Sequence, residues 1–192
     1  MLPYAGLWPR ILAFGCDYLI IASYLVGLAL SSVVLHAFSP TILPRFFGSP
    51  ASGQITGFVL ITLPVTLYFA LLESSPWQGT WGKHRLGLQV STRTGKRLSL
   101  AHALARTMLK FIPWELAHAC IWQVRVAGQE DSPWVLAGFL LVWVLVGANA
   151  LCMGITRTHQ ALYDWVAGTV VIRSMAVNGS DPGNSLARRA KD

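Results

Sequence analysis

The sequence predicts an all-α polytopic membrane protein with about four transmembrane helices and a small cytoplasmic β-hairpin or three-stranded sheet. Two observations carry this prediction. The 192-residue chain is 54% hydrophobic but only 12% charged, with a mean hydropathy of +0.51, whereas soluble domains carry about 25% charged residues. Its apolar residues also gather into long runs, and a helix needs about 20 such residues to cross the hydrocarbon core of a bilayer.

The first apolar run, residues 11–35, predicts the first span. It is longer than the apolar region of a cleavable signal peptide, roughly 7–15 residues, so we interpret it as a retained helix. Asp17 lies within this run, and Arg10 immediately precedes it. A carboxylate at such a depth costs roughly 2.5–3.5 kcal/mol on insertion scales. Asp17 therefore needs either a partner or a function.

Three further segments complete the predicted set of spans. Residues 55–72 and 134–153 are almost entirely apolar, whereas residues 102–126 are polar on one side. In that third segment His102, Arg106 and Lys110 recur every four residues and so share one helical face. A proline interrupts the segment at residue 113. We favour a kinked transmembrane helix over one that first follows the membrane interface.

The basic residues indicate how the chain is threaded, because cytoplasmic loops of membrane proteins are enriched in Lys and Arg. Four spans with both termini in the cytoplasm place eleven of the fifteen basic residues inside and two outside. The inside residues are Arg10, Lys83, Arg85, Arg93, Lys96, Arg97, Arg157, Arg173, Arg188, Arg189 and Lys191, and the outside residues are Arg45 and Arg125. The net charge of +7 thus reflects topology and attraction to anionic lipid headgroups, and we expect no nucleic-acid partner.

The segments between the spans are short. Residues 86–100 show partial apolar alternation around Thr94-Gly95, which predicts a cytoplasmic β-hairpin. The β-branched segment 168–173 could add a third, returning strand, and residues 178–192 are predicted to form a disordered basic tail. The turn around Lys83 lacks the pattern of a phosphate-binding loop, so we expect this lysine to face lipid.

Several of these features together resemble the RDD family of membrane proteins. They are Arg10 before the first span, Asp17 within it, the run GTWGKHRLGLQV at residues 79–90, Arg106 after Leu98-Ser99-Leu100, and HQALYDWVAGTVV at residues 159–171. The arginine of the family name matches Arg10, and its two aspartates match Asp17 and Asp164. Tyr163 stands where many members have histidine.

The resemblance covers roughly residues 5–173, which we take as one membrane domain. It implies a multi-pass protein of the bacterial inner (plasma) membrane. A transport role has been suggested for the family in general, and cation/proton exchange for some members. The resemblance supplies no settled activity, so the residues themselves have to carry the functional argument.

Arg10 and Asp17 lie on nearly the same helical face but about 10 Å apart along the axis, so we expect each to meet a distant partner. Asp164 is the expected partner of Arg10, and Arg106 with Lys110 the expected partners of Asp17. Two interpretations remain open. The cluster is a structural set of ion pairs that docks the first span, or Asp17 binds a cation or proton.

Other chemistry has weaker support. Glu115 and His118 have the i,i+3 spacing of two metal ligands on one helix, but one such pair is insufficient for a metal site. No spacing of Ser, His and acid predicts an active site, so we expect neither enzymatic activity nor a cofactor. Two function classes remain: a transporter, expected to be a homo-oligomer in which Gly27, Gly138 and Gly147 let helices approach closely, and a non-catalytic scaffold or assembly protein.

Overall fold

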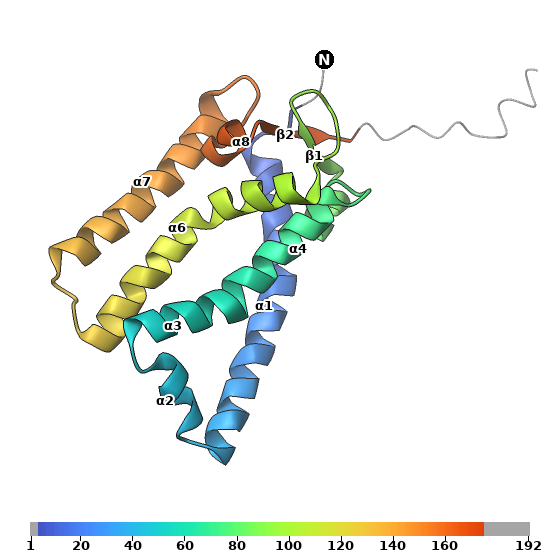
Figure 1. The fold of residues 1–192 in the computed structure, drawn as a ribbon. Coiled ribbons are helices and arrows are strands. Elements are labelled where there is room, and N and C mark those ends of the chain that lie inside the picture. The colour runs from blue at the N-terminus through green and yellow to red at the C-terminus, as the bar shows by residue number, and fades with distance from the viewer. Residues whose placement is uncertain (1–3, 175–192) are drawn as a thin grey trace, which may run out of the picture.

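The computed structural model describes residues 4–174, and it is mostly helical. Long helices form a bundle that carries a small cap at one end (Figure 1). The bundle comprises α1 (Leu7–Phe38), α3 (Pro50–Gly57), η1 (Phe58–Thr62), α4 (Leu63–Ser74), α6 (Leu100–Ala127) and α7 (Pro133–Ile155). The cap comprises α5 (Trp81–Arg85), α8 (Leu162–Val166) and a two-stranded sheet. A short helix, α2 (Ile42–Phe47), lies at the opposite end.

Three helical stretches are long and apolar enough to cross a membrane: Leu7–Phe38, Pro50–Ser74 and Pro133–Ile155. They contain the predicted spans 11–35, 55–72 and 134–153, which are therefore confirmed as apolar helices of spanning length. Large apolar side chains remain exposed along α1 and α7. Exposed apolar surface on this scale is expected where lipid replaces water as the solvent.

The helix predicted over residues 102–126 is present as α6, which begins where its cap was expected. The Ser99 hydroxyl accepts a hydrogen bond from the backbone N–H of His102 (3.3 Å). Gly128 ends the helix in the left-handed conformation, with φ of 63°. α6 is not among the three most apolar stretches, but it runs beside α4 and α7 and bends along its length (Figure 1). Pro113 lies within it, and proline is a common cause of such bends.

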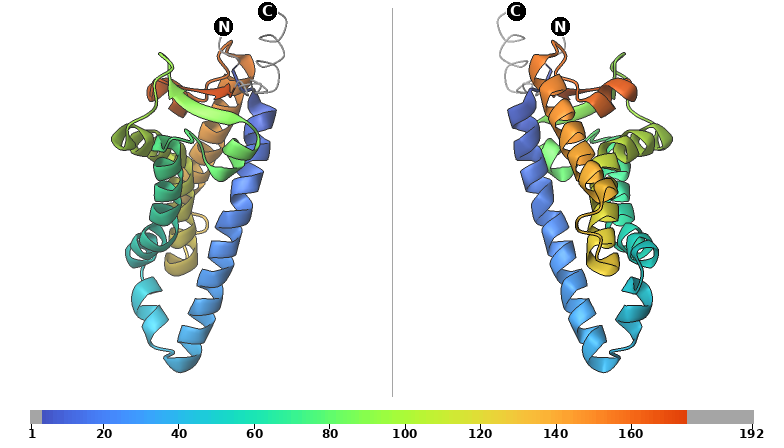
Figure 2. Two further views of the ribbon diagram at one scale, coloured as in Figure 1. Left: turned by 90° about the vertical axis from the view of Figure 1, so that its right-hand side faces the viewer. Right: turned by 90° about the vertical axis from the view of Figure 1, so that its left-hand side faces the viewer.

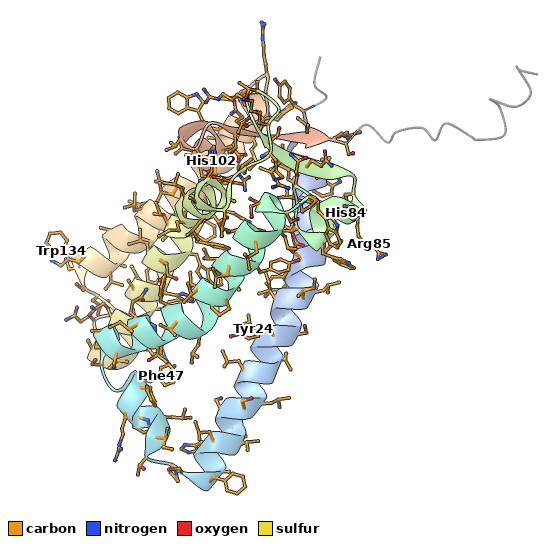
Figure 3. All side chains as sticks on the ribbon, turned by 45° about the vertical axis from the view of Figure 1, so that its right-hand side comes forward. Tyr24, Phe47, His84, Arg85, His102 and Trp134 are labelled. Atoms are coloured by element: carbon orange, nitrogen blue, oxygen red, sulfur yellow. The ribbon has the colours of Figure 1, made fainter. Side chains whose placement is uncertain are left out.

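The second apolar stretch contains a local irregularity where η1 joins α4. Pro64 has no N–H with which to bond the carbonyl of Leu60, four residues earlier. The hydroxyl of Tyr24 on α1 donates to that carbonyl instead, at 2.5 Å. Figure 3 shows Tyr24 on the long first helix. In a non-aqueous environment this side chain satisfies a backbone acceptor that would otherwise be costly.

The predicted β-hairpin over residues 86–100 is wrong. β1 (Leu88–Thr92) pairs antiparallel with β2 (Thr169–Arg173), in the register Val90 to Val171. The chain after β1 instead forms a turn, in which the Thr92 N–H bonds the Lys96 carbonyl at 2.9 Å. The other edge of β1 is occupied, because the Val90 N–H donates to the Gln78 carbonyl at 2.6 Å. The expected returning strand at 168–173 is confirmed, as the direct partner of β1.

The two described ends of the chain meet at the capped end of the bundle. Tyr4 forms an isolated bridge with Ile172, and the Ala5 N–H donates to the Val171 carbonyl at 2.9 Å. From this end α1 runs away and diverges from the other helices (Figure 2). The predicted tail at 178–192 lies outside the described residues.

One of the three glycines expected to let helices approach closely does so within the chain. A Cβ added to Gly138 on α7 would lie 2.4 Å from the sulfur of Cys120 on α6. The small residue therefore allows α6 and α7 to approach within one molecule, whereas we had expected it to serve contacts between copies. A Cβ on Gly27 or Gly147 would meet nothing within 4 Å, so these two glycines serve no such contact within residues 4–174.

Candidate functional site

The capped end of the bundle contains a buried cluster of ion pairs, which begins at Arg10. This arginine is 8% exposed and Asp164 is fully buried. The Arg10 Nη1 lies 2.5 Å from the Asp164 Oδ2, and its Nε donates to the Ala5 carbonyl at 3.1 Å. The structure thus brings together the arginine of α1 and the aspartate of α8, as predicted from the sequence.

Arg106 of α6 is the centre of the cluster. Its Nη2 and Nε donate to the Asp164 Oδ1 at 2.6 and 2.9 Å. Its Nη1 donates to the Glu73 Oε2 at 2.6 Å, and the other Glu73 oxygen pairs with the Lys83 ammonium. Five charges therefore alternate in one chain, Arg10–Asp164–Arg106–Glu73–Lys83, which connects α1, α8, α6, α4 and α5. We call these five residues the ion-pair chain.

Two members of the ion-pair chain were missed by the sequence analysis. Glu73 ends the second apolar run and attracted no attention, and Lys83 was expected to face lipid. Lys83 is instead 8% exposed and Glu73 is fully buried. The sequence did offer one signal. Glu73 and Lys83 lie on either side of the single turn between α4 and α5, and so at a similar depth in the membrane.

Three residues of the cap have shifted pKa values. Burial alone would raise the pKa of Asp164, but the nearby Arg106 and Arg10 outweigh it and hold this pKa below its ordinary value. Burial lowers the pKa of Lys83, and the attraction of Glu73 offsets only part of that effect. Burial together with the Asp164 carboxylate raises the pKa of Tyr163 to about 12. Asp164 is therefore held as a carboxylate and Tyr163 as a neutral phenol at neutral pH.

Asp17 does not pair with Arg106 or Lys110, so that expectation is wrong. Its carboxylate is fully buried and accepts from the Tyr68 hydroxyl (2.9 Å), the Thr80 hydroxyl (2.5 Å) and the Gly82 N–H (2.7 Å). The reason is that Arg106 is committed to Asp164 and Glu73. Neutral donors from α4 and from the start of α5 satisfy the buried acid instead.

Gly82 makes this arrangement possible. A Cβ at this position would lie 2.0 Å from the Ala13 carbonyl oxygen and 3.0 Å from the Asp17 Oδ1. Only a residue without a side chain lets α5 approach the backbone of α1 this closely. The segment GTWGK therefore needs glycine at residue 82 for a close backbone contact and not to form a phosphate-binding loop.

The three members of the basic stripe on α6 have different environments. His102 Nε2 lies 2.6 Å from the Ala167 carbonyl, and Figure 3 shows this histidine at the capped end. Arg106 belongs to the ion-pair chain. The Lys110 ammonium lies over the ring of Phe69, 3.4 Å from its centroid, and within 5.3 Å of the Phe14 centroid.

A second polar cluster lies further along the bundle around Glu115. Its carboxylate accepts from Gln54 Nε2 at 2.6 Å and from the Thr62 hydroxyl, and it lies 3.7 Å from His118 Nδ1. Within residues 4–174 no group of three or more potential metal ligands is present. Glu115 is therefore held by an amide and a hydroxyl, and the weak metal candidate gains no further ligand.

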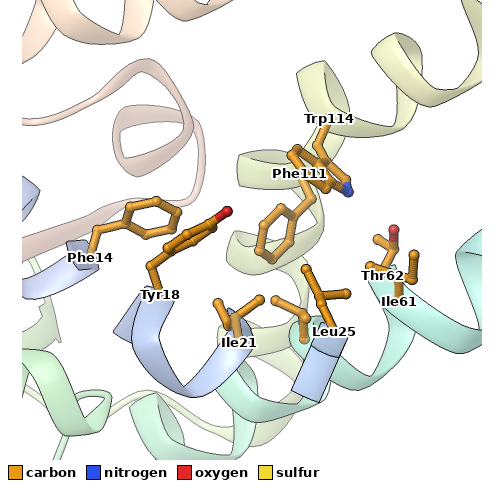
Figure 4. Close-up of a pocket in the computed structure, with 9 residues that line it drawn as sticks. Phe14, Tyr18, Ile21, Leu25, Ile61, Thr62, Phe111 and Trp114 are labelled. Atoms are coloured by element: carbon orange, nitrogen blue, oxygen red, sulfur yellow. The ribbon is translucent and has the colours of Figure 1, made fainter. Parts of the chain in front are cut away.

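An apolar pocket of about 80 Å³ lies between these two polar clusters. Figure 4 shows Phe14 and Tyr18 on α1 facing Phe111 and Trp114 on α6 across it, with Thr62 at its far side. The two polar clusters are thus separated by aromatic and aliphatic side chains. Nothing in this pocket offers an ion a series of polar ligands.

A larger cavity, of about 190 Å³, lies beside the ion-pair chain. We call it the inner cavity. Its lining includes Tyr163, several apolar residues, four basic side chains and one acid. The charged residues are Arg10, Lys83, Arg106, Lys110 and Asp17. Among its polar lining atoms, Arg10 Nη2 is buried and has no hydrogen-bond partner in the described part of the chain.

Comparison with known proteins identifies the family. The family model of the RDD family matches residues 4–168. An uncharacterized protein named YxaI from Bacillus subtilis (strain 168) is 32% identical over 110 residues, which cover 53% of this chain and 72% of that protein. No solved structure matches the chain significantly. The residues that carry the resemblance, Arg10, Asp17 and Asp164, lie together at the capped end, and the chain belongs to the RDD family.

Proposed function

We propose that this protein is a non-catalytic scaffold of the bacterial inner membrane, whose cap presents a basic surface to a cytoplasmic partner. The ion-pair chain carries the proposal. Both oxygens of Asp164 and both oxygens of Glu73 are already paired with basic groups, and Asp17 has three donors. Carboxylates saturated in this way are suited to holding elements in place rather than to loading and releasing ions.

The proposed topology has four spans with both termini in the cytoplasm. It is supported by the meeting of the two described chain ends at the cap, which requires an even number of crossings. α6 runs antiparallel to α7 beside it (Figure 1). The basic residues of the chain also concentrate in the cap, as expected of a cytoplasmic face.

The topology predicts opposite results for two reporter fusions. Green fluorescent protein inserted after Gly95 should fluoresce, because this turn lies in the cytoplasm. Alkaline phosphatase inserted after Glu130 should be active, because the α6–α7 loop lies outside. No phosphatase activity at the second site would mean that α6 does not cross, and no fluorescence at the first site would mean that the cap is not cytoplasmic.

The surface proposed to bind the partner is defined by six exposed basic residues of the cap. We call it the basic platform: Arg85, Arg93, Lys96, Arg97, Arg157 and Arg173. The one acid in residues 75–100 and 156–174 is Asp164, which is buried. The platform thus has a single sign of charge, and an acidic protein surface is its complement.

A matched pair of double variants tests the platform. Lys96→Gln with Arg97→Gln should reduce recovery of a cross-linked acidic partner by roughly two- to thirtyfold, since each of the two exposed charges contributes about 0.2–1 kcal/mol. Arg45→Gln with Arg125→Gln removes the same charge from exposed sites at the opposite end and should leave recovery unchanged. Equal recovery from both variants would contradict the scaffold proposal. Binding that instead requires only anionic vesicles would assign the platform to lipid.

Cation or proton transport through Asp17 is the second candidate, and one observation favours it. Asp17 lines the inner cavity without an ion-pair partner among residues 4–174. The four basic side chains in the same lining oppose a cation there. In sealed vesicles, transport predicts a proton or alkali-cation flux that Asp17→Asn abolishes and the exposed Asp131→Asn preserves. No flux from the native protein would remove this candidate.

A further inference from the structure

The charges that line the inner cavity do not balance. Around it stand four basic side chains, Arg10, Lys83, Arg106 and Lys110. The acids that meet them are Glu73 and Asp164 in the ion-pair chain, and Asp17 in the cavity wall. Three acids against four bases leave one positive charge in excess. Buried charge without compensation costs several kcal/mol per ion.

The excess can be assigned to particular atoms. Lys83 pairs with Glu73, and Arg106 pairs with both Glu73 and Asp164. Lys110 has neither a hydrogen-bond nor an ion-pair partner within residues 4–174, and its ammonium lies over the rings of Phe14, Phe69 and Phe111. Arg10 uses Nε and Nη1 but leaves Nη2 without a partner, although the side chain is more than nine-tenths buried. The uncommitted donors of the cavity are therefore Lys110 Nζ and Arg10 Nη2.

The residues already present do not complete the site. Contact with the Phe69 ring stabilises the half-buried Lys110 ammonium by about 0.5–2 kcal/mol, but it does not neutralise the charge. Asp17 is the one carboxylate in the lining, and its oxygens are bound to Tyr68, Thr80 and Gly82. Residues 4–174 therefore supply no free carboxylate that could neutralise the excess charge.

We propose that the inner cavity binds an oxyanion of the phosphate class between Lys110 and Arg10. Phosphate oxygens accept from both guanidinium and ammonium donors, and charge-assisted hydrogen bonds of this kind are the strongest that side chains make. About 190 Å³ is room for several water molecules or one small oxyanion. This site is separate from the basic platform and does not depend on the scaffold role.

The same chemistry has two sources, free phosphate and the headgroup of an anionic phospholipid. The apolar part of the lining includes Leu7, Ile11 and Phe14 of α1 and Met153 of α7. Ile11 and Phe14 are 45% and 44% exposed, so the wall on the α1 side is continuous with the surface that faces lipid. This geometry makes a headgroup held at the cytoplasmic end of the bundle the stronger expectation.

The experiment uses the full-length protein in two settings. In neutral detergent, inorganic phosphate is titrated against chloride at equal ionic strength, and the thermal midpoint is followed by tryptophan fluorescence. In nanodiscs, phosphatidylglycerol is compared with phosphatidylcholine. A saturable rise in the midpoint with phosphate identifies a free anion, and a rise only with phosphatidylglycerol identifies a headgroup. No rise in either setting overturns the proposal.

Lys110→Met and Lys96→Met separate the site from general charge effects. Lys110→Met removes the ammonium from the cavity, whereas Lys96→Met removes the same charge from the exposed turn. Loss of one charged hydrogen-bonding group should weaken apparent affinity about tenfold or more in Lys110→Met and leave Lys96→Met as in the native protein. Equal weakening in the two variants contradicts the site. If Lys110→Met does not fold, the phosphate and lipid comparisons on the native protein still decide.

Discussion

Asp164→Asn should lower the stability of the protein by about 3–5 kcal/mol, because it removes the one carboxylate shared by two buried guanidinium groups. Arg10 and Arg106 both donate to this side chain. No other acid among the described residues could take its place at either arginine without losing a contact that it already makes. Unfolding in detergent micelles, followed by tryptophan fluorescence in denaturant, measures the loss. The pairing contributes above the ordinary carboxyl pKa of 3.8 and is lost as the pH falls through the lowered pKa of the folded state.

Two control variants test whether the Asp164 result is specific. Asp131→Asn removes an exposed aspartate from the α6–α7 loop and should stay within about 0.5 kcal/mol of the native protein. Combining Asp164→Asn with Arg10→Gln should cost less than the sum of the single changes, because the double variant no longer buries Arg10 unpaired. Additive losses, or equal stability of the Asp164 and Asp131 variants, would contradict the ion-pair chain as a structural unit.

Gly82→Ala should also destabilise the protein, although it adds only one methyl group. The new Cβ would overlap the Ala13 carbonyl, at 2.0 Å, so α5 has to move away from α1. Overpacking of this kind costs about 1–3 kcal/mol. The displacement would also lengthen the hydrogen bond from the Gly82 N–H to Asp17, which leaves a buried carboxylate less well satisfied.

Gly15→Ala provides a control that should change stability in the opposite direction. Gly15 lies in α1, and a Cβ added there meets nothing within 4 Å. Alanine is favoured over glycine in a helix by about 0.8–1.0 kcal/mol, so this variant should be neutral or more stable. Both variants are compared by denaturant unfolding in the same detergent. A Gly82→Ala protein as stable as Gly15→Ala would show that the close approach of α5 is unnecessary.

Much of the fold could be predicted from apolar run length and capping residues. Three spans follow from hydropathy alone, and Ser99 marks the start of α6. The pairing of β1 was mispredicted because alternation over residues 86–100 does not say which partner a strand will take. The Gln78 backbone occupies one edge of β1, and the other edge is filled from the far end of the chain.

In the candidate site, contacts between opposite charges could be predicted from the sequence, and contacts between a charged group and neutral donors less so. Arg10 and Asp164 are paired as expected. Asp17 is satisfied by two hydroxyls and a backbone N–H, and such donors are too common in sequences to stand out. Arg106 pairs with Glu73 instead of with Asp17. One overlooked acid was therefore enough to reassign the partners of its neighbours.

The order of synthesis gives the pairing of Arg10 with Asp164 a further meaning. The two residues are separated by 154 positions, so Arg10 leaves the ribosome long before its carboxylate exists. Until α8 and β2 emerge, two arginines of the membrane-inserted chain lack their shared counterion. A polypeptide truncated before residue 164 thus lacks the carboxylate that both guanidinium groups share in the complete molecule.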